Sequence, residues 1–251
     1  PLMDVHAVRG QLTLDFVFAN EVVINSTKKS AVVLGDPALL LPYVYPQCRR
    51  DTNPSRRICL ILHNNDKNIN PTQFPEELIS HNVWHSTLDY HEMLENIMEC
   101  ELVVSSSLHG IIVAEAFGVP ARWIQLPGSA KSEGEFKYCD YYTGSRINDT
   151  SVDVSALMRD NGKGQCVGFD DEFNPFRPAK TVAEALIMGG APPIRGYNTA
   201  KLLQAFPLKL MSKSCSPLNN SVNMMIGADL SDTPLKDATT HMKETKKAFE
   251  S

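Results

Sequence analysis

The residue types best suited to chemistry gather in one short segment, residues 105–110, where three serines precede a leucine, a histidine and a glycine. The apolar residues 102–104 predict a buried strand, which the serines end because their hydroxyls compete for backbone hydrogen bonds. A helix is expected to begin at Gly110 and to stop at Gly118. Amide N–H groups at the start of a helix attract anions. The segment therefore predicts a phosphate or carboxylate site with His109 beside it as a proton donor.

The elements that position this segment alternate between strand and helix. The sequence predicts strands at residues 5–8, 22–24, 31–34, 57–63, 83–85, 102–104 and 122–126, and helices at residues 11–19, 71–80, 89–99 and 110–118. Asp36 is expected to cap a helical turn that starts at Pro37. Residues 57–63 are apolar almost throughout, as in a parallel strand covered on both faces. The alternation predicts an α/β fold, doubly wound around a mainly parallel Rossmann-like sheet.

The pattern changes beyond Pro127, and we expect three parts of the chain. Residues 1–145 are predicted to form the Rossmann-like domain that carries the anion site. Residues 146–211 are predicted to form a helical extension packing on it, with helices at residues 152–158, 179–188 and 197–210. Residues 212–251 are rich in Ser, Asn, Lys and Thr, which predicts a mostly disordered tail.

Composition limits the partners and the compartment. The formal charge of −5 gives no basic field for nucleic acid, and no apolar stretch is long enough to span a membrane. The six cysteines form no CxxC pair, which predicts neither a metal site nor a disulfide framework and favours a reducing compartment. They are Cys48, Cys59, Cys100, Cys139, Cys166 and Cys215. Glycosylation sequons at Asn25, Asn148 and Asn219 are also compatible with a secretory compartment.

Residues 105–120 resemble the signature of the polysaccharide pyruvyl transferase family. Residues 8–13, 35–42 and 136–142 resemble its other recurring segments in the same order. The resemblance implies two facing Rossmann-like domains in a GT-B-like architecture, with the donor held by the C-terminal domain. On this reading the chain is that C-terminal half, and the N-terminal domain that should precede Val5 is missing.

The resemblance implies transfer of pyruvate from phosphoenolpyruvate to two hydroxyls of one sugar in a cell-surface glycan, with no further cofactor and no metal. The vinyl carbon must be protonated, and histidine suits this task near neutral pH. We predict His109 as the general acid and Arg9 as the second catalytic residue, since guanidinium binds phosphate and carboxylate. The other predicted donor contacts are Ser105, Ser106, Ser107, Leu108, Gly110, Glu115, Lys137 and Tyr138.

Several of these positions have a second interpretation. Many family members carry Arg where Ser107 stands, so backbone N–H groups of this loop, or Arg122 or Arg146, would have to replace it. Glu115 either contacts the donor or pairs with a base on a neighbouring loop. His109 and Arg9 could serve structure alone. Residues 137–142 are either an aromatic platform for a sugar or the edge of an amphipathic helix. His6, His63 and His85 are predicted to be packing or surface residues.

Two other functions remain open from the sequence. A nucleotide-sugar-dependent glycosyltransferase of the GT-B type also carries a His-Gly pair followed by Glu-Ala and Gly-x-Pro. An inactive remnant that binds a glycan or a partner is the second, because half of the cleft is missing. We expect a cytoplasmic location, or the Golgi lumen for a eukaryotic protein. The acceptor sugar, the linkage and the oligomeric state are not determined by these residues.

Overall fold

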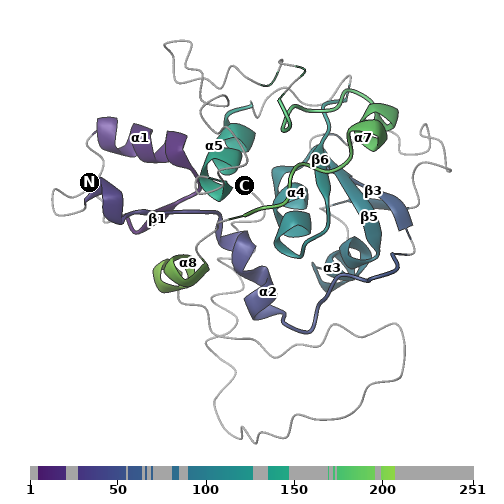
Figure 1. The fold of residues 1–251 in the computed structure, drawn as a ribbon, viewed down its shortest axis with the longest axis horizontal. Helices are drawn as coiled ribbons and strands as arrows, with labels where there is room; N and C mark the ends of the chain where they lie inside the picture. The colour runs from purple at the N-terminus through teal and green to yellow at the C-terminus, as the bar shows by residue number, and fades with distance from the viewer. Residues whose placement is uncertain are drawn as a thin grey trace, which may run out of the picture. The chain divides into compact units, whose positions relative to one another are not determined.

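The computed structural model of the chain (Figure 1) describes residues 5–20, 28–54, 56–63, 66, 69, 81–84, 90–126, 135–146, 169, 172, 174–195 and 199–206. All of them belong to one compact unit, Pro1–Cys215. Among the described residues, no helix is long and apolar enough to cross a membrane.

The largest sheet is fully parallel and has four strands. They are β3 (Arg56–Leu62), β4 (His81–Trp84), β5 (Cys100–Ser105) and β6 (Ala121–Trp123), in the spatial order β4-β3-β5-β6. The chain passes outward from β3 to β4, then returns through α3 (Tyr90–Met98) to place β5 on the other side of β3. The strand order therefore reverses between β3 and β5, and ligands of open α/β sheets bind at the carboxyl ends of the strands at such a switch point.

Helices cover both faces of this sheet, as a doubly wound fold requires. Ile58, Leu60 and Leu62 of β3 form one buried cluster with residues of α7 (Val182–Met188). Side chains alternate between the two faces of a strand, so Ile61 points the other way, where it lies beside Gly110 of α4 (Leu108–Ala116). The α/β fold with parallel strands predicted from the sequence is confirmed.

Two short strands form a separate parallel pair. β1 (Ala7–Val8) pairs with β2 (Val33–Leu34), and α1 (Gln11–Ala19) follows β1 directly. The turn after β2 contains the short helices η2 (Pro37–Leu40) and α2 (Leu41–Val44), preceded by η1 (Lys29–Ala31). In the described part of the chain, this pair is not an extension of the four-stranded sheet, although sequence alternation alone does not separate the two.

Most predicted elements have counterparts, with shifted ends. α4 begins at Leu108 rather than at Gly110. α7 begins at Val182, later than expected, because Ala179 forms a bridge to Ile124 and Thr181 caps the helix through the N–H of Glu184. α5 (Phe136–Ser145) and α8 (Thr199–Ala205) complete the described helices. The predicted strand at 22–24, the helices at 71–80 and 152–158, and the tail at 212–251 lie outside the described residues.

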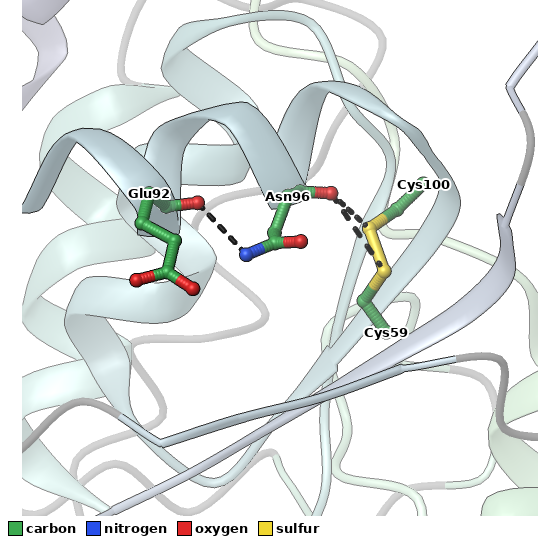
Figure 2. The surroundings of a disulfide bond; sticks show 4 residues. All are labelled: Cys59, Glu92, Asn96 and Cys100. Carbon is green, nitrogen blue, oxygen red and sulfur yellow. Dashed lines mark hydrogen bonds between the residues drawn. A yellow bond between two sulfur atoms is a disulfide. The ribbon is translucent and has the colours of Figure 1, made fainter. Parts of the chain in front are cut away.

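A disulfide joins Cys59 of β3 to Cys100 of β5 (Figure 2). Both cysteines are fully buried, and both sulfur atoms face the backbone carbonyl oxygen of Asn96 near the end of α3, at 3.9 and 2.9 Å. The expectation that the cysteines form no disulfide was wrong. The chain spacing of these cysteines gave no sign of the bond because it depends on two neighbouring strands that are distant in sequence.

Candidate functional site

The serine loop lies at the switch point and is bonded to the end of β3. Ser105 Oγ is 2.9 Å from the carbonyl oxygens of Ile61 and Ser107, and it accepts a hydrogen bond from the N–H of Ser107 at 3.0 Å. The N–H of Ser106 donates to the carbonyl oxygen of Ile61 at 3.1 Å. The Ser105 hydroxyl therefore points into the protein and holds the loop in place.

The hydroxyl of Ser106 joins the ends of the two central strands. It accepts a hydrogen bond from the N–H of His63 at 3.0 Å and donates one to Asp66 Oδ2 at 2.5 Å. The carbonyl oxygen of Ser106 accepts a hydrogen bond from the hydroxyl of Tyr138 at 2.7 Å. Since Ser106 is 8% exposed and Asp66 is 3% exposed, this network is shielded from water and stronger than its surface equivalent.

His109 is the second residue of α4 and is half-buried. Burial lowers the pKa of His109 most, Arg9, Lys137 and His63 lower it further, and Asp36 raises it. The imidazole therefore lies among titratable groups of four other segments. The structure brings together His109, Arg9 and Lys137, the three residues on which the predicted donor site depends.

Gly110 allows α4 to lie close to the sheet. A Cβ atom at this position would be 2.5 Å from Ser105 Oγ and 3.0 Å from Ile61 Cγ2. Leu108 is 2% exposed and packs inward. Gly110 and Leu108 thus set the position of the first turn of α4, whose amide N–H groups have no acceptor within the helix.

Arg9 forms an ion pair with Asp36, with 2.8 Å between Nε and Oδ2. The Arg9 side chain is 33% exposed, while the carboxylate of Asp36 is 5% exposed. The other oxygen of Asp36 accepts the N–H of Ala38 at 2.9 Å, so the predicted cap of this helical turn is confirmed. Because the pair engages the Nε side of the guanidinium, it orients Arg9 at the edge of the site.

Two close backbone contacts fix the position of Arg9 against α5. A Cβ atom at Gly10 would overlap the carbonyl oxygen of Asp140, and one at Gly144 would overlap the carbonyl oxygen of Arg9. Asp140 also caps the start of α1, since its carboxylate accepts hydrogen bonds from the N–H and the hydroxyl of Thr13 at 2.8 and 2.6 Å. These contacts hold Arg9 and α5, which carries Lys137, in one arrangement.

Lys137 is half-buried in the first turn of α5. Burial, followed by the charge of Arg9, lowers the pKa of Lys137 to about 8, although Asp66 opposes the shift. Its ammonium lies 5.5 Å from the centre of the Tyr138 ring. A lysine held with other cations and partly removed from water gains from binding an anion.

The three tyrosines of α5 belong to the interior. Tyr138 stacks on Trp123 with ring centres 3.9 Å apart and is 4% exposed, and Tyr141 and Tyr142 are almost fully buried. Of the two interpretations of residues 137–142, the structure has the helix, and it leaves no exposed ring face of these three tyrosines for a sugar. Tyr138 instead supports the loop through Ser106.

Glu115 is bonded to two side chains of the same chain. Its carboxylate forms an ion pair with Arg146 at 2.7 Å and accepts a hydrogen bond from the hydroxyl of Tyr141 at 2.5 Å. The Arg146 guanidinium is fully buried and lies 4.8 and 4.7 Å from the rings of Tyr142 and Phe176. Of the two interpretations of Glu115, the pairing with a neighbouring base is the one present.

Arg122 does not stand in for the arginine that many family members carry at position 107. Its guanidinium donates to the carbonyl oxygens of Gly189 and Pro175 at 2.7 and 2.6 Å. Arg122 instead helps to line an open pocket of about 570 Å³ with Pro120, Met188 and residues 190–193. Pro120 precedes β6, so this pocket is at the opposite strand end from the serine loop. Arg146, the other expected substitute, is committed to Glu115.

Sequence reasoning missed three charged groups of the site: His63, Asp66 and Asp36. His63 was predicted to serve packing or the surface, and Asp36 to act as a helix cap alone. A signal did exist for His63, because it ends the most apolar strand, whose carboxyl end lies at the switch point once β5 pairs with β3. That pairing depends on strand order, which the sequence pattern does not determine.

Comparison with known proteins supports the resemblance. The polysaccharide pyruvyl transferase family matches residues 3–126. An uncharacterized protein of Acanthamoeba polyphaga mimivirus is 28% identical over 167 residues, which make up 64% of this chain and 51% of that protein. The chain thus spans about half the length of this curated relative. No solved structure matches the chain. The part of the chain that is similar to the polysaccharide pyruvyl transferase family, residues 3–126, contains Arg9, the serine loop and His109.

Proposed function

We propose that the protein transfers pyruvate from phosphoenolpyruvate to two hydroxyls of a glycan sugar and forms a cyclic ketal. The similarity of residues 3–126 to a transferase family supports the reaction class. The observation that carries the proposal is the gathering of Arg9, Lys137 and His109 around the start of α4. Phosphoenolpyruvate carries a phosphate, a carboxylate and a vinyl group, and these residues offer one group of suitable chemistry for each.

The binding step depends on the charges of the site. Arg9 and Lys137 supply two cations, but the carboxylates of Asp36 and Asp66 lie near them. A donor with three negative charges would bind the guanidinium of Arg9 on the side away from Asp36. It would also contact the ammonium of Lys137 and the amide N–H groups of the first turn of α4. In this half-buried setting each contact is stronger than it would be in bulk water.

The chemical step requires a proton at the vinyl carbon. In the free site, the pKa of His109 is lowered by burial and by the nearby cations. A bound anion raises that pKa, because the negative charge stabilises the imidazolium. Binding of the donor thus causes His109 to take up a proton. His109 then gives this proton to the vinyl carbon, so that a hydroxyl can attack the neighbouring carbon.

A binding experiment tests the donor assignment. We expect phosphoenolpyruvate to stabilise the full-length protein against thermal unfolding and the Lys137→Met variant to lose about tenfold or more in affinity. Lys180→Met is the matched control, since Lys180 is exposed and bonds to Gln125 on the surface. Stabilisation by a nucleoside diphosphate and not by phosphoenolpyruvate would contradict this proposal. That result would favour a nucleotide-sugar-dependent glycosyltransferase.

We also propose that the protein matures in an oxidising compartment such as the Golgi lumen. The buried Cys59–Cys100 disulfide supports this location, because disulfides are rare in reducing compartments. The sequons at Asn25, Asn148 and Asn219 are consistent with it. Protein from its native cells, unfolded in denaturant, should resist alkylation of Cys59 and Cys100 until it is reduced. It should also lose mass when treated with an N-glycosidase. Alkylation of Cys59 and Cys100 without reduction contradicts the proposal.

A further inference from the structure

His63 and His109 follow neighbouring strands, and the charge of Lys137 acts on both. His63 follows β3 directly, and His109 lies at the start of the helix after β5, the strand that pairs with β3. Burial lowers the pKa of each imidazole most, and Lys137 lowers both further. His63, when protonated, also lowers the pKa of His109. The two histidines therefore belong to one site, at the reversal of strand order.

The backbone of His63 is fixed relative to the serine loop. Its N–H donates to Ser106 Oγ at 3.0 Å, and the same hydroxyl donates to Asp66 Oδ2 at 2.5 Å. One buried hydroxyl thus connects the residue after β3 to the loop that leads into α4. The His63 side chain is half-buried, so it keeps access to solvent from which a second substrate could approach.

Ketal formation needs proton transfers in two directions. A proton must be added to the vinyl carbon, and a proton must leave the hydroxyl that attacks the neighbouring carbon. Pairs of titratable groups in different environments commonly divide such tasks. His109 is assigned to the donation in the proposed function, and His63 is the second imidazole at the same site.

We propose that His63 is the general base that accepts the proton of the first attacking acceptor hydroxyl. This inference rests on the proposed function. From the sequence alone, His63 is predicted to be a packing or surface residue. In this proposal it acts together with His109, and each imidazole serves one direction of proton transfer.

His109 gives its proton to C3 of phosphoenolpyruvate, the hydroxyl oxygen bonds to C2, and the hydroxyl proton passes to His63. The bond from C2 to the phosphate oxygen then breaks, its electron pair leaves with the phosphate, and the phosphate takes the proton from His63. The second hydroxyl bonds to C2 and gives its proton to His109. Both imidazoles regain their starting states, and the products are the ketal and hydrogen phosphate.

The pH dependence of this base follows from its surroundings. Lys137 from α5 lowers the pKa of His63, and Asp66 from the segment after β3 raises it. The imidazole of His109 in α4 is the other titratable group coupled to His63. Burial is the largest influence and also lowers the pKa. His63 is therefore neutral and able to accept a proton at neutral pH, and its protonation reduces turnover as the pH falls.

The test measures phosphate release from phosphoenolpyruvate by the full-length protein with a panel of purified oligosaccharides as acceptors. With the best acceptor, we expect His63→Gln to lower kcat by about a hundredfold or more, as for loss of a general base. The loss of activity on the acid side of the kcat profile should disappear in this variant, while its affinity for phosphoenolpyruvate stays within about threefold. His6→Gln is the matched control, because His6 is an exposed histidine next to a strand.

Each other outcome overturns the inference in a distinct way. Turnover of His63→Gln within about twofold of the unaltered protein, with both active, removes the base and leaves the proposed function standing. Reduced turnover that keeps the acid side of the profile assigns His63 a structural role only. Absence of phosphate release by the unaltered protein with every acceptor removes the proposed function and this inference together.

Discussion

At the scale of single residues, the site is a set of charges that modify one another. Arg9, Lys137 and His63 lower the pKa of His109, while Asp36 raises it. The pKa of Lys137 is in turn lowered by burial and by the charge of Arg9. The carboxylates of Asp36 and Asp66 oppose these shifts, and a bound anion would further offset the repulsion among the positive charges. The affinity of the site for an anion should therefore depend on pH.

Affinity for phosphoenolpyruvate should fall as the pH rises. Above the lowered pKa of His109 in the free protein, binding requires uptake of a proton, so affinity declines by up to about tenfold per pH unit until the pKa of the complex is reached. A further decline is expected above about 8, where Lys137 loses its charge.

Titration calorimetry between about pH 6 and about pH 9, in two buffers of different ionisation enthalpy, measures the affinity and the proton uptake. The titration of phosphoenolpyruvate itself affects the unaltered protein and His109→Gln equally. The ratio of their affinities at each pH therefore reports on His109 alone. A ratio that does not change with pH, or equal heats in both buffers, contradicts this account of His109.

Glu115 gives a prediction that separates stability from binding. Glu115→Gln leaves the fully buried Arg146 guanidinium without its counter-charge, and we expect the free energy of unfolding to fall by about 3–5 kcal/mol. Affinity for phosphoenolpyruvate should stay within about twofold at a temperature where the variant is folded. Glu184→Gln breaks the partly exposed pair with Arg177 and should cost under about 1 kcal/mol. Urea unfolding measures the free energy of unfolding of both variants. A loss of affinity for phosphoenolpyruvate in Glu115→Gln alone would show that Glu115 contacts the donor.

At the scale of elements, the site depends on how closely α4 lies on the sheet. The first turn of α4 meets β5 and β3 through Gly110, and the loop before it is bonded to Ile61 and to the backbone of His63. On the other side of the site, Gly10 and Gly144 bring Arg9 against α5. The position of each functional group is thus set by close contact between elements from distant parts of the sequence.

Replacing Gly110 with alanine should disturb both stability and donor binding. The new Cβ atom would lie 2.5 Å from Ser105 Oγ, so α4 or β5 must shift, at a cost of about 1–3 kcal/mol. Gly118→Ala is the control: its φ of 78° disfavours alanine, but no atom lies within 4 Å of the new Cβ. The control should lose about 1 kcal/mol and keep its affinity for phosphoenolpyruvate. Thermal unfolding measures the stability of both variants, and calorimetry measures their affinity for phosphoenolpyruvate. Unchanged affinity in Gly110→Ala would show that α4 does not contribute to the donor site.

At the scale of the whole molecule, local patterns predicted the elements and the central motif, but long-range pairing determined the rest. The helix at Gln11–Ala19 and strands β3, β5 and β6 follow from apolar spacing. The Cys59–Cys100 disulfide and the role of Ser106 as a junction do not, since both require knowing that β5 lies beside β3. His63 was set aside for the same reason.

The identity of the acid is the central claim, and one measurement tests it most directly. Phosphate release from phosphoenolpyruvate by the full-length protein, with a glycan panel as acceptor, should occur in the unaltered protein and fall by about a hundredfold or more in His109→Gln. The same variant should still fold, as shown by unfolding with the midpoint within a few degrees of the unaltered protein. Phosphate release by His109→Gln at a rate close to that of the unaltered protein would contradict the account.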